Sequence, residues 1–139
     1  MRARGEGKME NIKLRRFLGL AGIVSVLNAL GYILVPSALL PNYGIAAAPG
    51  AILGFRLLGA ALLGFGLILW FLRLSHDWTA QRGLLIGASA GNIVGVIVSL
   101  WATLTGIMNG SGWLFVVTYA VFLIGYLYFL WEGMQKKHG

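Results

Sequence analysis

The stretch from Thr79 to Thr103, TAQRGLLIGASAGNIVGVIVSLWAT, has a small or hydroxyl-bearing residue at every fourth position. These residues are Thr79, Gly83, Gly87, Gly91, Gly95, Ser99 and Thr103. On a helix with 3.6 residues per turn, a spacing of four keeps them on one slowly drifting stripe. Membrane helices associate closely where small residues admit a neighbouring backbone. The stretch therefore predicts a membrane helix with a groove that a second helix fills.

The whole chain has the composition of an integral membrane protein. Of its 139 residues, 58% are hydrophobic and 11% are charged, whereas soluble domains carry about a quarter charged residues. Its 21 glycines would each cost a soluble helix about 1 kcal/mol relative to alanine. The absence of cysteine excludes disulfides, thiol nucleophiles and cysteine-ligated metals.

Four apolar segments are each about long enough to cross a hydrocarbon layer of roughly 30 Å. The predicted helices span about residues 14–35, 51–72, 79–105 and 113–131. We predict an all-α, up-down-up-down four-helix membrane bundle over residues 14–132, with glycine-rich close packing. A flexible basic segment (1–13), whose translation start is Met1 or Met9, precedes the bundle, and a basic tail (133–139) follows it.

The charges predict the orientation of the bundle. All lysines and arginines except Arg56 lie outside the apolar segments: near the N-terminus, around Arg73 and Arg82, and in the tail. The loops between the first and second and between the third and fourth segments are uncharged. By the positive-inside rule, both termini lie in the cytoplasm. We therefore expect a multi-pass protein of the inner (cytoplasmic) membrane that meets anionic lipid on its cytoplasmic side and binds no nucleic acid.

The second helix is the expected partner of the small-residue stripe. It carries small residues four apart, in the pairs Gly50/Gly54 and Ala60/Gly64, and a short turn joins it to the third helix. The predicted packing residues are Gly54, Gly64, Gly83, Gly87, Gly91 and Gly95.

Three of the polar residues within the apolar segments are candidates for function. Arg56 either contacts an anion or a lipid phosphate, or extends its long side chain to the headgroups. Asn28 and Asn92 lie near mid-membrane, on helices that could face each other. They are expected to form interhelical polar contacts, with a polar solute or ion as the alternative partner.

The fourth helix carries aromatic residues at alternating spacings of four and three. They are Phe115, Tyr119, Phe122, Tyr126 and Phe129. These spacings place the five rings on one face. The face either packs against glycine-rich neighbours or forms the surface that meets a partner subunit or a ligand.

The sequence contains no pattern that indicates catalysis or a metal. No Asp, Glu, His or Lys lies within an apolar segment, so a proton-coupled antiporter would lack its carboxylate. His76 and Asp77 are adjacent in a tight turn, where Asp77 is expected to cap the third helix. We expect no enzyme, no metal and no cofactor.

The chain resembles small, uncharacterised four-helix membrane proteins of bacteria over residues 17–129. The resemblance is carried by Pro36 with Tyr43-Gly44, the run from Arg56 to Gly64, Arg73 and Arg82, and Asn109 with Gly112-Trp113. It implies a fold and a topology, and brings no substrate or catalytic residue.

These observations favour a non-enzymatic integral membrane protein, acting as a small scaffold or accessory subunit of a larger membrane complex. The alternatives are an oligomeric carrier or channel for a small neutral or anionic solute, and a lipid-binding membrane protein. The expected partners are membrane-protein subunits or further copies of this chain.

Overall fold

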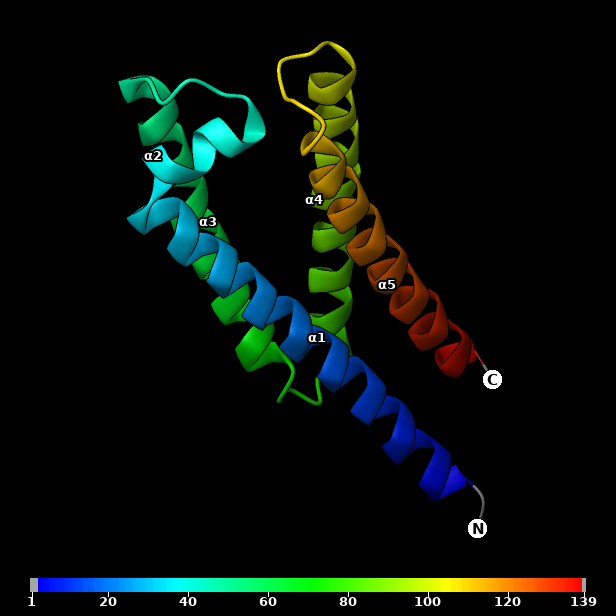
Figure 1. Ribbon diagram of the computed structural model, residues 1–139. Coiled ribbons are helices and arrows are strands. Elements are labelled where there is room, and N and C mark those ends of the chain that lie inside the picture. The colour runs from blue at the N-terminus through cyan, green and yellow to red at the C-terminus, as the bar shows by residue number, and fades with distance from the viewer. Residues whose placement is uncertain (1–2, 139) are drawn as a thin grey trace.

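The computed structural model describes residues 3–138, and the side chains of residues 12–135. All regular structure in this range is helical. The elements are α1 (Ala3–Leu34), α2 (Pro36–Leu39), the 3-10 helix η1 (Leu40–Tyr43), α3 (Pro49–Leu72), α4 (Trp78–Leu104) and α5 (Gly112–His138) (Figure 1). Each of the four long helices contains a stretch long and apolar enough to cross a membrane. The fold is therefore that of a multi-pass helical membrane protein.

The outer limits of the first and last helices differ from the prediction. Helix α1 begins at Ala3 instead of residue 14, and α5 continues to His138 instead of ending near residue 131. The flanking segments ARGEGKMENIK and GMQKKH are rich in Ala, Arg, Glu, Lys, Met and Gln, which favour helix. They therefore continue the helices beyond the apolar stretches. Met1, Arg2 and Gly139, which belong to the predicted flanks, lie outside the described residues.

Prolines set the path between α1 and α3. Pro36 and Pro49 lie at the first positions of α2 and α3, where the missing N–H costs nothing and the fixed φ suits a helix. Gly44, at φ +78°, ends η1 in the left-handed conformation, which glycine adopts without strain. The chain therefore turns tightly at Pro41–Gly44.

Helices α1 and α3 form an antiparallel hairpin in which backbone meets backbone. A Cβ atom added to Gly66 would lie 2.9 Å from the carbonyl oxygen of Gly22, and one added to Gly59 would lie 2.9 Å from that of Ala29. Both pairs, 22 to 29 and 59 to 66, are seven residues apart. Seven residues fall only about 20° short of two full helical turns, so this spacing keeps the small residues on the shared face of the two helices.

Helices α4 and α5 form a second antiparallel hairpin, in which side chains fill the space above small residues. The Tyr119 ring lies against Gly95, Thr103 against Gly112, and the Trp78 ring against Gly133. Here it is mainly aromatic rings that fill the spaces above the glycines.

The predicted packing of α3 into the small-residue stripe of α4 is wrong. A Cβ added to Gly54, Gly64, Gly83, Gly87 or Gly91 would meet no atom within 4 Å. The physical reason is the drift of the stripe, because four residues turn a helix about 40° beyond a full turn. From Thr79 to Thr103 the stripe therefore moves through roughly 240°. Only its last part, from Gly95 onward, faces α5.

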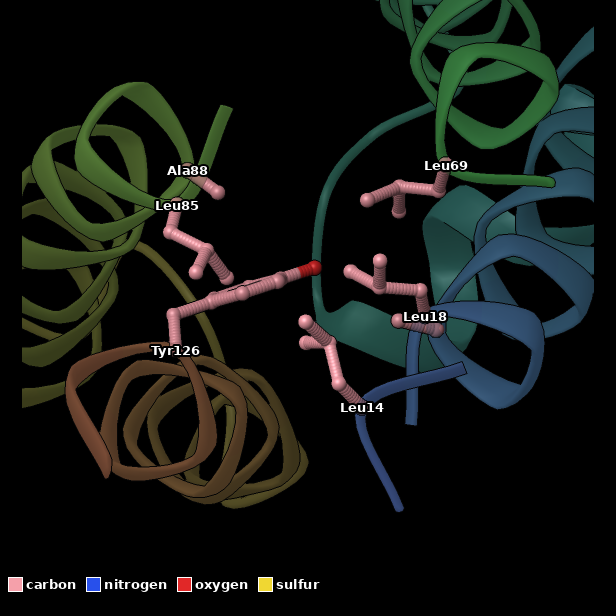
Figure 2. Close-up of a cluster of buried hydrophobic side chains, with 7 residues drawn as sticks. Leu14, Leu18, Leu69, Leu85, Ala88 and Tyr126 are labelled. Carbon is pink, nitrogen blue, oxygen red and sulfur yellow. The ribbon is translucent and has the colours of Figure 1, made fainter. Parts of the chain in front are cut away.

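The two hairpins meet at both ends. At the terminal end, near the turn of residues 73–77, a cluster of Leu14, Leu18, Ala21, Leu69, Leu85, Ala88 and Tyr126 joins all four long helices. We call it the terminal cluster. Figure 2 shows Tyr126 of α5 extending towards Leu18 and Leu69 of the other hairpin. At the loop end, the connections α2–η1 and α4–α5 are hydrogen-bonded to each other.

The hairpin contact between α1 and α3 gives a prediction. Gly66→Ala places a methyl group against the Gly22 carbonyl and the Val26 side chain, so stability should fall by about 1–3 kcal/mol, as overpacking does. Reversible unfolding in detergent micelles measures this loss. The control Gly91→Ala enters open space and should leave stability unchanged or higher. Equal stability of the two variants would contradict the close contact.

Candidate functional site

A cavity of about 310 Å³ lies between the two hairpins. Its walls come from α1, η1, α3, α4 and α5. The polar lining residues are Ser25, Asn28, Asn92 and Thr118, together with the tyrosines Tyr32, Tyr43, Tyr119 and Tyr126. Three phenylalanines, Phe65, Phe115 and Phe122, form much of the apolar wall. None of the lining residues carries a charge.

The two asparagines face this cavity and do not bond to each other. The Asn28 side-chain amide donates to the Val24 carbonyl at 2.8 Å, and that of Asn92 donates to the Ala88 carbonyl at 2.7 Å. The predicted interhelical contact is therefore absent, because the hairpins are separated at this height and each amide bonds within its own helix. Each amide retains its carbonyl oxygen and a second N–H for a guest in the cavity.

The aromatic face of α5 points into the molecule. Phe115, Tyr119, Phe122 and Tyr126 line the cavity. Phe129 lies below it and packs against Phe17 of α1, with ring centres 5.2 Å apart. Since this face is turned inward, it is available to a ligand between the hairpins and not to a subunit on the outside.

Tyr126 forms part of the floor of the cavity. Its side chain is 2% exposed and belongs to the terminal cluster. The hydrogen bonds among the described residues include none from its hydroxyl. Every fully buried side-chain oxygen of residues 12–135 has a hydrogen-bond partner. The Tyr126 hydroxyl has none among these residues, so it is not fully buried. Because Tyr126 lines the cavity, we infer that its hydroxyl is open to the cavity.

The loop end forms the roof. The Tyr43 ring meets the Phe115 ring edge-on, with centres 4.8 Å apart. The Asn109 backbone N–H donates to the Tyr43 carbonyl at 3.0 Å. The Asn42 carbonyl accepts from the Asn109 amide at 3.1 Å and from the Ser111 hydroxyl at 2.9 Å. We call these three bonds the loop clamp.

The sequence did not predict the loop clamp, although asparagine occurs in both uncharged loops. The bonds use the backbone carbonyls of Asn42 and Tyr43, which no sequence pattern singles out. Gly44 is required beside them, because a Cβ there would lie 3.0 Å from the Asn109 nitrogen. The available signal in the sequence was Gly44, a residue type that adopts positive φ, together with the lack of charge in both loops.

Arg56 lies away from the cavity. Its side chain is exposed on α3, and it is not among the lining residues. A molecule bound in the cavity therefore makes no contact with Arg56. The proposed contact of Arg56 with an anion or lipid phosphate remains an expectation about the outer surface.

The turn between α3 and α4 has a structural role. Asp77 caps α4 by accepting from the Thr79 backbone N–H at 2.9 Å, as predicted. Arg73 lies 3.5 Å from the ring centre of Trp70 and donates to the Trp70 carbonyl. Within the described part of the chain, His, Cys, Asp and Glu form no group of three that could hold a metal ion.

No protein-family model, curated protein or solved structure matches this chain. The resemblance to small bacterial four-helix membrane proteins therefore remains an expectation from the sequence.

The loop clamp can be tested by distance measurement, because the chain has no cysteine. Spin labels at Ala47→Cys and Gly110→Cys would report the separation of the two loops. Asn109→Ala combined with Ser111→Ala removes two side-chain hydrogen bonds, each contributing about 0.5–1.5 kcal/mol. We expect the distance distribution to broaden and lengthen in electron paramagnetic resonance. Asn42→Ala keeps the accepting carbonyl and should change nothing; an unchanged distribution in the double variant would refute the clamp.

Proposed function

We propose that this chain is a non-enzymatic multi-pass membrane protein that binds a small neutral molecule between its two hairpins. The observation that carries the proposal is the uncharged cavity with amide, hydroxyl and phenol groups in its wall. Its volume lies at the lower end of the range of ligand sites. Mostly apolar walls with a few polar groups are typical of such sites.

The charge distribution supports a neutral ligand over an anionic one. An ion within a hydrocarbon layer requires a counter-charge or a set of strong hydrogen bonds. Arg56 is the single charged residue of the apolar segments, and it does not line the cavity. Asparagine amides and tyrosine hydroxyls instead suit a hydroxyl, carbonyl or amide group.

Binding also fits these groups better than catalysis does. Amide and aliphatic hydroxyl groups do not titrate near neutral pH, and phenols titrate near pH 10. The cavity thus offers hydrogen bonds without an acid–base pair of the kind that drives proton transfer. Transport or retention of the bound molecule is the corresponding activity.

The proposed orientation has both termini in the cytoplasm, in the inner membrane. The turn of residues 73–77 lies at the same end of the molecule as the N-terminal part of α1 (Figure 1), whose sequence includes Lys13, Arg15 and Arg16. The positive-inside rule assigns such an end to the cytoplasm. The uncharged loop end then faces outward.

Cysteine labelling in spheroplasts tests this orientation. A membrane-impermeant maleimide should modify Ala47→Cys from outside. Leu74→Cys, in the turn at the terminal end and also exposed, should react only after lysis. Labelling of Leu74→Cys in intact spheroplasts would reverse the assignment.

Native mass spectrometry in mild detergent tests the ligand. The wild-type protein should retain a neutral small molecule. Asn28→Leu with Asn92→Leu preserves side-chain size but removes both amides, so retention should fall roughly tenfold or more if each lost hydrogen bond contributes about 1 kcal/mol. Asn42→Leu, at an exposed position of η1 that does not line the cavity, should retain the molecule. Equal retention by all three proteins would contradict the cavity as the site.

A second candidate function is supported by the open face of α4. Gly83, Gly87 and Gly91 are exposed and have free space above them, whereas Gly22 and Gly66 are covered by a helix within the chain. A transmembrane helix of another protein would fit such a face, as an accessory subunit would require. In the same mass spectra, a stoichiometric protein partner without a small molecule would favour this function.

A further inference from the structure

We propose that the molecule bound in the cavity is a bilayer-dissolved neutral lipid with one hydrocarbon chain and a hydroxyl- or carbonyl-bearing head group. We infer that it enters sideways between α1 and α5, with its head group bound by the Tyr126 hydroxyl. This inference rests on the proposed binding of a neutral molecule and adds its chemical class and its route.

Contacts between the two hairpins bridge both ends of the cavity. At the loop end, the loop clamp holds the two connections together, and Tyr43 packs against Phe115. At the terminal end, Leu14, Leu18 and Leu69 pack with Tyr126. An aqueous solute would have to break one of these contacts to enter.

We place the entrance to the cavity between α1 and α5, because its exposed lining residues belong to these two helices. These helices touch near the terminal end, where Phe17 packs against Phe122 and Tyr126, and they diverge towards the loop end (Figure 1). The exposed lining residues are Asn28 on α1 and Leu114 on α5. The lining residues of α3 and α4 are half-buried. The opening therefore lies between α1 and α5.

The opening lies at the depth of the hydrocarbon layer. Asn28 is six residues from the end of α1 at Leu34, or about 9 Å along the helix axis. Asn92, on the opposite wall, is close to the middle of α4. A molecule that passes this opening comes from the lipid phase, so it must dissolve in the bilayer.

The cavity wall specifies the head group. The Tyr126 residue is buried as a whole, but its hydroxyl is open to the cavity and makes no hydrogen bond among the described residues. It can donate one hydrogen bond, which a hydroxyl or carbonyl oxygen accepts. The Asn28 and Asn92 carbonyl oxygens can accept from a ligand hydroxyl. A cavity of about 310 Å³ holds a head group and the first carbons, so the rest of the chain stays in the bilayer.

Photo-crosslinking in phosphatidylcholine vesicles tests this inference on the full-length protein. The probe is a long-chain fatty alcohol with a diazirine beside its hydroxyl group and an alkyne at its tail. We expect saturable insertion into the lining segments of α1 and α5, read by peptide mass spectrometry. Tyr126→Phe should lower the yield roughly 3- to 10-fold, as loss of one hydrogen bond would. Tyr128→Phe, a 48% exposed tyrosine of the same helix, should leave it unchanged.

Two further variants test the route and the hydroxyl. Asn28→Trp narrows the opening and should reduce labelling severalfold, whereas Leu27→Trp, at a neighbouring position that does not line the cavity, should not. Tyr126→Phe should melt at the same temperature as the wild-type protein, because its hydroxyl has no partner to lose. A lower melting temperature would show that the hydroxyl is bonded within the protein, and would overturn the proposal.

The outcomes separate this inference from the function on which it rests. If a short-chain, water-soluble analogue labels the cavity residues as strongly as the long-chain probe, the lipid inference falls and binding of a neutral molecule stands. If neither probe labels them and the purified protein retains no small molecule, both fail. Insertion confined to the outer faces of the helices, insensitive to Tyr126→Phe, also overturns the inference.

Discussion

The close backbone contact between α1 and α3 is the constraint on which the rest of the structure depends. Gly22 faces Gly66, and Ala29 faces Gly59, so a Cβ on Gly66 or on Gly59 would lie only 2.9 Å from a carbonyl oxygen of α1. Lipid chains are as apolar as leucine, so membrane helices gain little from apolar burial and associate through such packing. A hairpin joined in this way behaves as one unit. Among the described residues, the contacts that join the second hairpin to it are the terminal cluster at one end and the loop clamp at the other.

This arrangement explains how a polar cavity can persist within a small membrane protein. Near mid-height, polar side chains are satisfied by carbonyls of their own helix, as Asn28, Asn92 and Thr118 show. They therefore need no partner across the gap, and no strong polar attraction draws the hairpins together there. The loop clamp and the terminal cluster fix the separation instead. The hydrogen-bonding capacity that remains faces the cavity.

The sequence predicted the four long helices and the cap at Asp77, because each depends on local chemistry. It misplaced the packing. The small residues of α4, spaced four apart, formed a continuous stripe in the sequence. On the helix this stripe turns around the axis, so Gly83, Gly87 and Gly91 face no neighbour among the described residues. The spacing of seven residues, between Gly22 and Ala29 and between Gly59 and Gly66, was the better signal for helix packing. The cavity could not be predicted, since it depends on where two hairpins separate.

The site residues, too, were predictable where they depend on local sequence and not where they depend on packing. The aromatic spacing of α5 indicated one functional face, and that face lines the cavity, but its inward direction depends on Phe17 of α1 packing over Gly125. The sequence analysis identified Tyr126 only as one of five aromatic residues on the same face of the helix. Its position at the floor, among Leu14, Leu18 and Leu69, leaves its hydroxyl as a hydrogen-bond donor at the apolar end of the cavity. A ligand oxygen would accept that hydrogen bond, and this makes Tyr126 the residue that connects the fold to its proposed function.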